Sequence, residues 1–198
     1  MTETLFPTIQ RYKNEQHVEI ELRFGKFNGT MFDTNVGKHT FDTVMKGLNK
    51  YTGWEKMVGS EHDVFYRNSD NVRISTDQAT GDEEVVKKDR IMNHDFKGMS
   101  NTPFDIRYSV SIETPLPDIA DREMDMKKTK QRVSYIRKNL SIDLTIITGD
   151  TSDMDVEDPV TYQVEFEIID ASRVNTKDDV FKLMHKINDV FIMLNNTK

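Results

Sequence analysis

Two segments near opposite ends of the chain alternate strictly between polar and apolar residues. Residues 18–24 read V-E-I-E-L-R-F and residues 162–168 read Y-Q-V-E-F-E-I. Successive side chains of a β-strand point to opposite faces, so Glu19, Glu21 and Arg23 share one face of the first strand. Gln163, Glu165 and Glu167 share one face of the other. Carboxylates two residues apart repel one another and need a cation or basic neighbours. For one such strand, a solvent-exposed outer face is the favoured interpretation.

Several further segments carry charged residues on their polar face. In chain order these positions are Arg73 and Ser75; Arg107, Ser109, Ser111 and Glu113; Lys128, Lys130, Arg132 and Ser134; and Ser141, Asp143 and Thr145. If all of these faces point into a closed barrel, its interior holds carboxylates for a metal ion and cations for a polyphosphate. The pattern then indicates a catalytic interior, with the apolar faces turned outwards.

The same patterns predict a mainly β, α+β chain in which helices flank a run of antiparallel strands. Further strands are expected around residues 64–67, 71–76, 84–92, 106–113, 132–137 and 141–147. Helices are expected at residues 5–12, interrupted by Pro7, and at 41–48, capped by Thr40. A third helix begins at a capping box of Thr176 and Asp179 and has an apolar stripe that includes Phe181. The acidic stretch 149–159 is expected to be an exposed loop. We therefore predict a closed antiparallel barrel with helices packed on its outside.

The composition limits the classes of function. The 198 residues suit one domain, and a formal net charge of −7 argues against non-specific nucleic-acid binding, which needs a basic surface. The chain has no cysteine, and its five histidines are scattered without metal-ligand spacing. No G-x-x-x-x-G-K-[ST] phosphate loop is present. No segment has the roughly 20 apolar residues that span a bilayer, and no secretory signal is visible. The absence of cysteine fits an intracellular, reducing location, which is therefore expected.

An ordered set of motifs resembles the triphosphate tunnel metalloenzymes. The motifs are E-I-E-L-R-F-G at 19–25, S-I-E-T-P at 111–115, K-Q-R-V-S-Y at 130–135, S-I-D-L-T at 141–145 and Q-V-E-F-E at 163–167. The branch that they resemble is the metal-dependent RNA triphosphatases of fungal and large-DNA-virus mRNA capping, including a giant-virus (mimivirus-like) capping enzyme. The resemblance implies a closed eight-stranded antiparallel tunnel. It also implies that residues 1–198 form a single RNA triphosphatase domain, part of a longer capping enzyme, in a virion or at a cytoplasmic viral replication site.

The resemblance assigns roles to particular residues. It implies that Glu19, Glu21 and Glu167 bind the metal. The phosphate-binding cations match Arg73, Lys88, Lys130 and Arg132, and further acidic positions of the site match Glu113, Asp143 and Glu165. The chain departs from the family at Gln163, where an acidic residue would complete an E-x-E-x-E strand, and at Arg23, where the family often has Lys. Carboxylate ligands suit Mg²⁺ or Mn²⁺ and do not suit zinc.

The function that this resemblance implies is removal of the γ-phosphate from 5′-triphosphate RNA, with hydrolysis of nucleoside triphosphates as a side activity. One alternative is a small-molecule triphosphatase acting on thiamine triphosphate or polyphosphate, or an adenylyl cyclase. Another is a non-catalytic polyphosphate-binding barrel. No K-x-D-G motif is present, so a guanylyltransferase is expected as a linked or associated partner, and no membrane is expected. Tyr66, Tyr108 and Tyr135 are scattered, and no aromatic and basic platform for RNA is expected.

Overall fold

A computed structural model describes residues 1–98, 103–117, 119, 121–149 and 160–195. The helices are α1 (Thr2–Tyr12), α2 (Lys38–Lys50), the 3₁₀ turn η1 (Ala171–Arg173) and α3 (Lys177–Asn195). The strands are β1 (Val18–Asn28), β2 (Met31–Asp33), β3 (Lys56–Arg67), β4 (Val72–Asp77), β5 (Glu83–Phe96), β6 (Asp105–Pro115), β7 (Met126–Arg137), β8 (Leu140–Thr148) and β9 (Thr161–Ile168).

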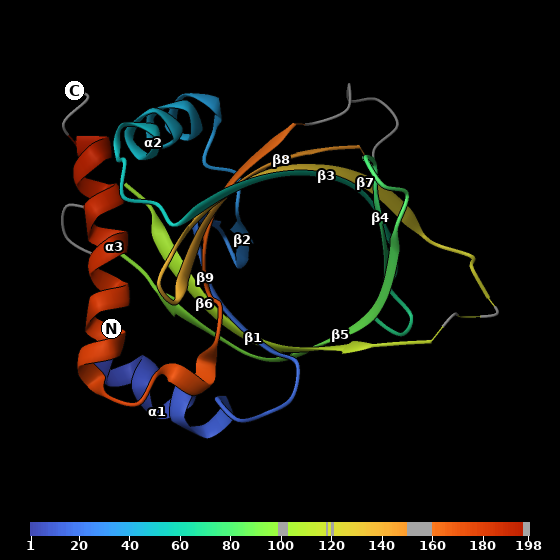
Figure 1. The fold of residues 1–198 in the computed structure, drawn as a ribbon, viewed down its shortest axis with the longest axis horizontal. Coiled ribbons are helices and arrows are strands. Elements are labelled where there is room, and N and C mark those ends of the chain that lie inside the picture. The colour runs from blue at the N-terminus through green and yellow to red at the C-terminus, as the bar shows by residue number, and fades with distance from the viewer. Residues whose placement is uncertain (99–102, 118, 120, 150–159, 196–198) are drawn as a thin grey trace.

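Eight of the strands close into a barrel. The sheet runs β2-β1-β6-β5-β4-β3-β7-β8-β9, every pairing is antiparallel, and an additional pairing of β9 with β1 closes the ring. The remaining strand, β2, pairs only with the last residues of β1, from Lys26 to Asn28. Figure 1 shows the barrel end-on, as a ring of strands, with α1, α2 and α3 gathered on one side. The predicted closed eight-stranded tunnel with external helices is confirmed.

The hydrophobic core lies outside the barrel, between it and the helices (Figure 1). Leu5 and Ile9 of α1 have no exposed surface, and the Phe24 ring of β1 is equally buried. The centroid of the Phe24 ring lies 4.6 Å from that of Phe191 in α3 and 5.2 Å from that of Phe166 in β9. Burying each of these side chains contributes about 1.5–3 kcal/mol, so the apolar faces are held outwards and the charged faces inwards.

The structure extends several predicted strands. β3 begins at Lys56, well before residue 64, and its first half pairs with β7 along its length. The alternation of polar and apolar residues is weak there, because Gly59 and Ser60 interrupt it. Backbone pairing with β7 stabilises this half of the strand instead. β2 was also missed, since three residues are too few to show a period.

Three details of the helices differ from expectation. α1 continues through Pro7, because the buried Leu5 and Ile9 hold it against the core on either side of the lost N–H donor. α2 begins two residues before Thr40 and has Gly37 at its N-cap. Phe181 does not lie on the buried stripe of α3 and is 55% exposed.

The capping box of α3 is confirmed. The Asp179 backbone N–H donates to Thr176 Oγ1 at 3.1 Å, and the Thr176 backbone N–H donates to Asp179 Oδ2 at 2.9 Å. The expected acidic loop lies outside the described residues, except for Gly149 at its start. No helix in the described part of the chain is long and apolar enough to cross a membrane.

Candidate active site

The interior of the barrel is a charged tunnel. It contains two cavities, of about 590 and 470 Å³, which share five lining residues: Glu21, Arg23, Tyr66, Arg73 and Lys88. Every residue that the sequence assigned to the site lines the smaller of these cavities, namely Glu19, Glu21, Arg73, Lys88, Glu113, Lys130, Arg132, Asp143, Glu165 and Glu167. Residues from seven strands therefore meet at one place, and the structure places none of the assigned residues elsewhere.

Strand pairing brings the carboxylates together. Glu21 lies directly opposite Glu167 across the β1–β9 closure, and Glu19 is two residues earlier on the same face of β1. On the other side of β9, Glu165 lies opposite Asp143 of β8. Opposed residues of antiparallel strands have their Cβ atoms about 4.5–5.5 Å apart, so these carboxylates repel one another strongly unless cations intervene.

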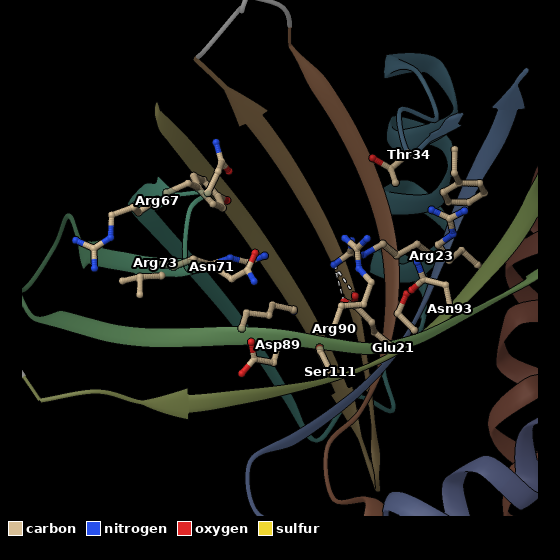
Figure 2. Close-up of a pocket in the computed structure, with 17 residues that line it drawn as sticks. Glu21, Arg23, Thr34, Arg67, Asn71, Arg73, Asp89, Arg90, Asn93 and Ser111 are labelled. Atoms are coloured by element: carbon tan, nitrogen blue, oxygen red, sulfur yellow. Dashed lines mark hydrogen bonds and ion pairs between the residues drawn. The ribbon is translucent and has the colours of Figure 1, made fainter. Parts of the chain in front are cut away.

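Cations separate most of these carboxylates. The Lys88 ammonium pairs with Glu19 and lies 2.8 Å from Glu113 Oε1. The Arg23 guanidinium lies between two glutamates, with Nη2 2.6 Å from Glu21 Oε1 and Nε 2.6 Å from Glu165 Oε1. Figure 2 shows Arg23 beside Glu21 within the larger cavity.

Arg132 connects β7 to β8 and β9. Its Nη1 donates to Asp143 Oδ2 at 3.2 Å, its Nη2 to Glu165 Oε2 at 3.1 Å and its Nε to Thr145 Oγ1 at 3.1 Å. The side chains of Asp143 and Glu165 are only 3% and 7% exposed. The guanidinium therefore pairs with two buried carboxylates, of which Glu165 also pairs with Arg23.

Burial and charge push the carboxyl pKa values in opposite directions. Burial raises the pKa of Glu19, but the Lys88 ammonium and its hydrogen bond outweigh burial and lower it to about 2. Burial also dominates at Glu167, where the neighbouring Glu19 and Asp143 add to it and raise the pKa to about 7. The pKa of Glu21 is raised by burial, which Arg23 offsets only in part. Glu165 keeps a lowered pKa, because Arg23 and Arg132 outweigh its burial.

The acidic set fits a divalent cation. In the described part of the chain no ion pair reaches Glu167, although it faces Glu21 and is half-buried. A cation between these carboxylates would relieve the repulsion that raises their pKa values, and their hard oxygen atoms suit Mg²⁺ or Mn²⁺. No group of three acidic or histidine side chains among the described residues is already arranged around a metal position. Glu19 and Glu21 instead turn to Lys88 and Arg23.

The raised pKa of Glu167 predicts a pH dependence of stability. The folded protein holds a proton on Glu167 up to about pH 7, whereas the unfolded chain releases it near the ordinary value of 4.5. The free energy of unfolding of the metal-free protein should therefore fall as pH rises through this window. The lowered pKa values of Glu19 and Glu165 act only below it. Thermal denaturation in EDTA at pH 5 and 7.5 measures the fall, which Glu167→Gln should reduce. An equal fall in that variant would contradict the assignment.

The sequence missed several residues that line the tunnel. His62 lines the smaller cavity, and Tyr66 lines both. Lys128, which the sequence placed on the charged face of its strand without a role in the site, also lines the smaller cavity. The Tyr66 ring centroid lies 5.3 Å from Arg73 Cζ and 5.7 Å from Lys130 Nζ. Tyr66 lies two positions after the lumenal Val64, so extending the alternation of β3 would have found it.

The departure from the family pattern at Gln163 has a structural consequence. Gln163 lines the tunnel, and its side-chain amide donates to Thr34 Oγ1 at 2.6 Å. The Tyr162 backbone N–H donates to Asn35 Oδ1 at 3.1 Å in the same region. Gln163 therefore helps to hold the segment between β2 and α2 against the start of β9.

Comparisons with known proteins agree with this geometry. The family model described as the mRNA capping enzyme, beta chain, matches residues 30–198. The mRNA-capping enzyme subunit beta of Schizosaccharomyces pombe is 33% identical over 112 residues, covering 52% of this chain and 36% of the relative. The subunit of the same name from Yarrowia lipolytica is 29% identical over 87 residues, covering 44% and 22%. The matches thus span about a third or less of these relatives.

A solved structure has the same fold. The S. pombe Pct1 RNA triphosphatase, in complex with the Spt5 CTD, superposes with a TM-score of 0.75 over 99% of this chain and 90% of that one, at 20% identity. At this identity the likeness establishes the fold of the tunnel. The roles of the side chains inside it have to be argued from their own contacts.

Proposed function

This chain belongs to the mRNA capping enzyme beta-chain family, and from that premise we propose that it removes the γ-phosphate from the 5′-triphosphate end of RNA. The observation that carries the proposal is the smaller cavity, where paired carboxylates and at least four cations line one space. A phosphate-binding module needs the cations alone. The additional buried and mutually repelling glutamates are the ligands that an enzyme using a divalent metal needs.

Lys and Arg side chains would hold the phosphates. Arg73 and Lys88 reach the lumen from β4 and β5, and Lys130 and Arg132 reach it from β7. Guanidinium groups bind two phosphate oxygens at once. Guanidinium and ammonium groups alike stabilise the charge that moves to the leaving group. Glu113, Asp143 and Glu165 orient these cations through the ion pairs described above.

Glu19, Glu21 and Glu167 would hold the metal, as the resemblance implies and as their repulsion favours. When bound, Mg²⁺ or Mn²⁺ offsets the charge of the γ-phosphate and polarises its phosphorus atom. The chain's own contribution is to keep these carboxylates close together and ionisable. Lys88 also keeps Glu19 ionised, because its ammonium group lowers the pKa of the Glu19 carboxyl.

The relatives suggest the wider context. Because the matches span a minor part of those subunits, we propose that residues 1–198 are the triphosphatase domain of a longer or multi-subunit capping enzyme. A guanylyltransferase is then the expected partner. A viral source and a location in a virion or at a viral replication site stay predictions, and the two relatives described above come from fungi.

Phosphate release from γ-labelled triphosphate RNA tests the proposal. We expect release that requires Mg²⁺ or Mn²⁺ and exceeds release from thiamine triphosphate or polyphosphate under the same conditions. Faster turnover of thiamine triphosphate or polyphosphate would favour the small-molecule alternative. Tight binding of triphosphate without release from any substrate would favour the non-catalytic barrel.

Free nucleoside triphosphates should also be cleaved, and all four at similar rates. The charged side chains that line the smaller cavity would bind the triphosphate, which every nucleotide shares. Steady-state hydrolysis of ATP, GTP, CTP and UTP measures this. A preference for one base of about a hundredfold, or ~2.7 kcal/mol, would reveal a dedicated base pocket.

A further inference from the structure

The larger cavity ends at an aromatic and basic cluster that the charged site does not use. Its lining includes Phe32 and Thr34 next to β1, and Asn93 and Arg107 from β5 and β6. In Figure 2, Arg23, Thr34 and Asn93 lie on one side of this cavity, and Arg67, Asn71 and Arg73 lie on the other. The cavity also includes Glu21 and Lys88, so it leads from the charged site to the cluster.

The Phe32 ring occupies space that is free because Gly25 has no side chain. A Cβ atom at Gly25 would lie 2.6 Å from Phe32 Cζ and would also collide with the carbonyl oxygen of Asp33. Any side chain at this position would therefore push the ring away. Gly25 lies on the same face of β1 as Glu19, Glu21 and Arg23, because the four positions are successive alternate residues of the strand. The Phe32 ring therefore covers the lumenal face of β1.

Arg107 is fixed against the same ring. Its Cζ lies 4.4 Å from the Phe32 centroid, and its Nε and Nη2 donate to the two carboxylate oxygens of Asp95 at 2.7 and 3.0 Å. The Phe27 ring backs Phe32 at a centroid distance of 5.2 Å. A planar cation, locked by a carboxylate and packed on an aromatic ring, forms a preorganised flat surface.

We propose that Phe32 and Arg107 form a platform for the first nucleoside of the triphosphate-ended substrate. This inference rests on the proposed function. Gly25 is four residues from Glu21, roughly 13 Å along the strand, which matches the reach from the γ-phosphorus to the base of an extended nucleotide. Aromatic rings and guanidinium planes stack on any base, so the platform adds affinity without base preference. The proposal departs from the expectation that no aromatic and basic platform is present, which weighed only the tyrosines.

The test compares substrates with and without a nucleoside. Phe32→Leu keeps an apolar side chain but removes the π-face. KM should rise about fivefold or more for triphosphate RNA and ATP, with little change in kcat, while inorganic tripolyphosphate should be cleaved as by the parent. Arg107→Lys keeps the charge, loses the plane and should shift KM in the same direction. Met31→Leu, on the same strand and 67% exposed in the parent, is the matched control and should change nothing.

The outcomes separate the two proposals. If the parent cleaves triphosphate RNA but Phe32→Leu leaves KM unchanged, or weakens tripolyphosphate hydrolysis equally, the platform is refuted and the proposed function stands. If the parent releases no phosphate from triphosphate RNA, the proposed function itself fails. Should Phe32→Leu lose its fold by circular dichroism, Arg107→Lys decides alone by the same KM comparison.

Discussion

Replacing Glu21 by alanine should abolish γ-phosphate release from triphosphate RNA. Glu21 lies opposite Glu167 and beside Glu19, so removing it takes one carboxylate from the proposed metal site. Loss of an outer-shell partner alone typically lowers metal affinity or activity about 10- to 100-fold, and loss of a ligand should cost at least that. Single-turnover phosphate release at saturating Mn²⁺ measures the effect. Glu19→Ala and Glu167→Ala should behave alike.

Stability gives an independent measure of the same site. Burial and neighbouring carboxylates raise the pKa values of Glu21 and Glu167, so removing either should not destabilise the metal-free fold. Mn²⁺ should raise the melting temperature of the parent but not of the three variants. Glu61→Ala is the control for activity and for the Mn²⁺ effect. The Glu61 carboxylate lies on the outer face of β3, where it accepts a hydrogen bond from Gln131. Near-normal turnover by any of the three would remove that residue from the metal site.

Arg132→Ala should both inactivate and destabilise the protein. The substitution removes the cation that pairs with the buried Asp143 and leaves the buried Glu165 with Arg23 alone. Breaking a buried ion pair from one side costs about 3–5 kcal/mol, and the partial exposure of Arg132 favours the lower end. For a domain of this size, a loss of about 3 kcal/mol lowers the melting temperature by roughly 6–12 °C.

A conservative variant and a control on the same strand isolate the cause. Arg132→Lys keeps the charge but cannot reach three acceptors at once, so activity should fall appreciably without vanishing. Lys127 lies on the outer face of the same strand, pairs with Asp63 and is 51% exposed. The free energy of unfolding of Lys127→Ala should therefore stay within about 0.5 kcal/mol of the parent value. Parent-like activity of Arg132→Ala would exclude it from phosphate binding.

The local pattern of the sequence determined which residues share a face. The two-residue period of β1, β6, β7, β8 and β9 is visible without a structure, and it grouped Glu19 with Glu21 and Lys130 with Arg132. It worked best in β1, β6, β8 and β9, because each has one continuous apolar face, buried against the helices or neighbouring strands, that fixes its register. Where that face is interrupted, as at Gly59 and Ser60 in β3, the prediction lost half of the strand.

Only the tertiary structure decided which way the charged faces point and what lies across from them. Alternation alone is equally compatible with a charged face in solvent, and it was barrel closure between β1 and β9 that turned this face inwards. Closure also placed Arg23 between Glu21 and Glu165. The pairing of β1 with both β2 and β6 set Phe32 beside Arg107, which is far from it in the sequence. Pairing between distant strands depends on the summed packing of the whole barrel. No single segment encodes it, so these contacts follow from the fold and not from the pattern.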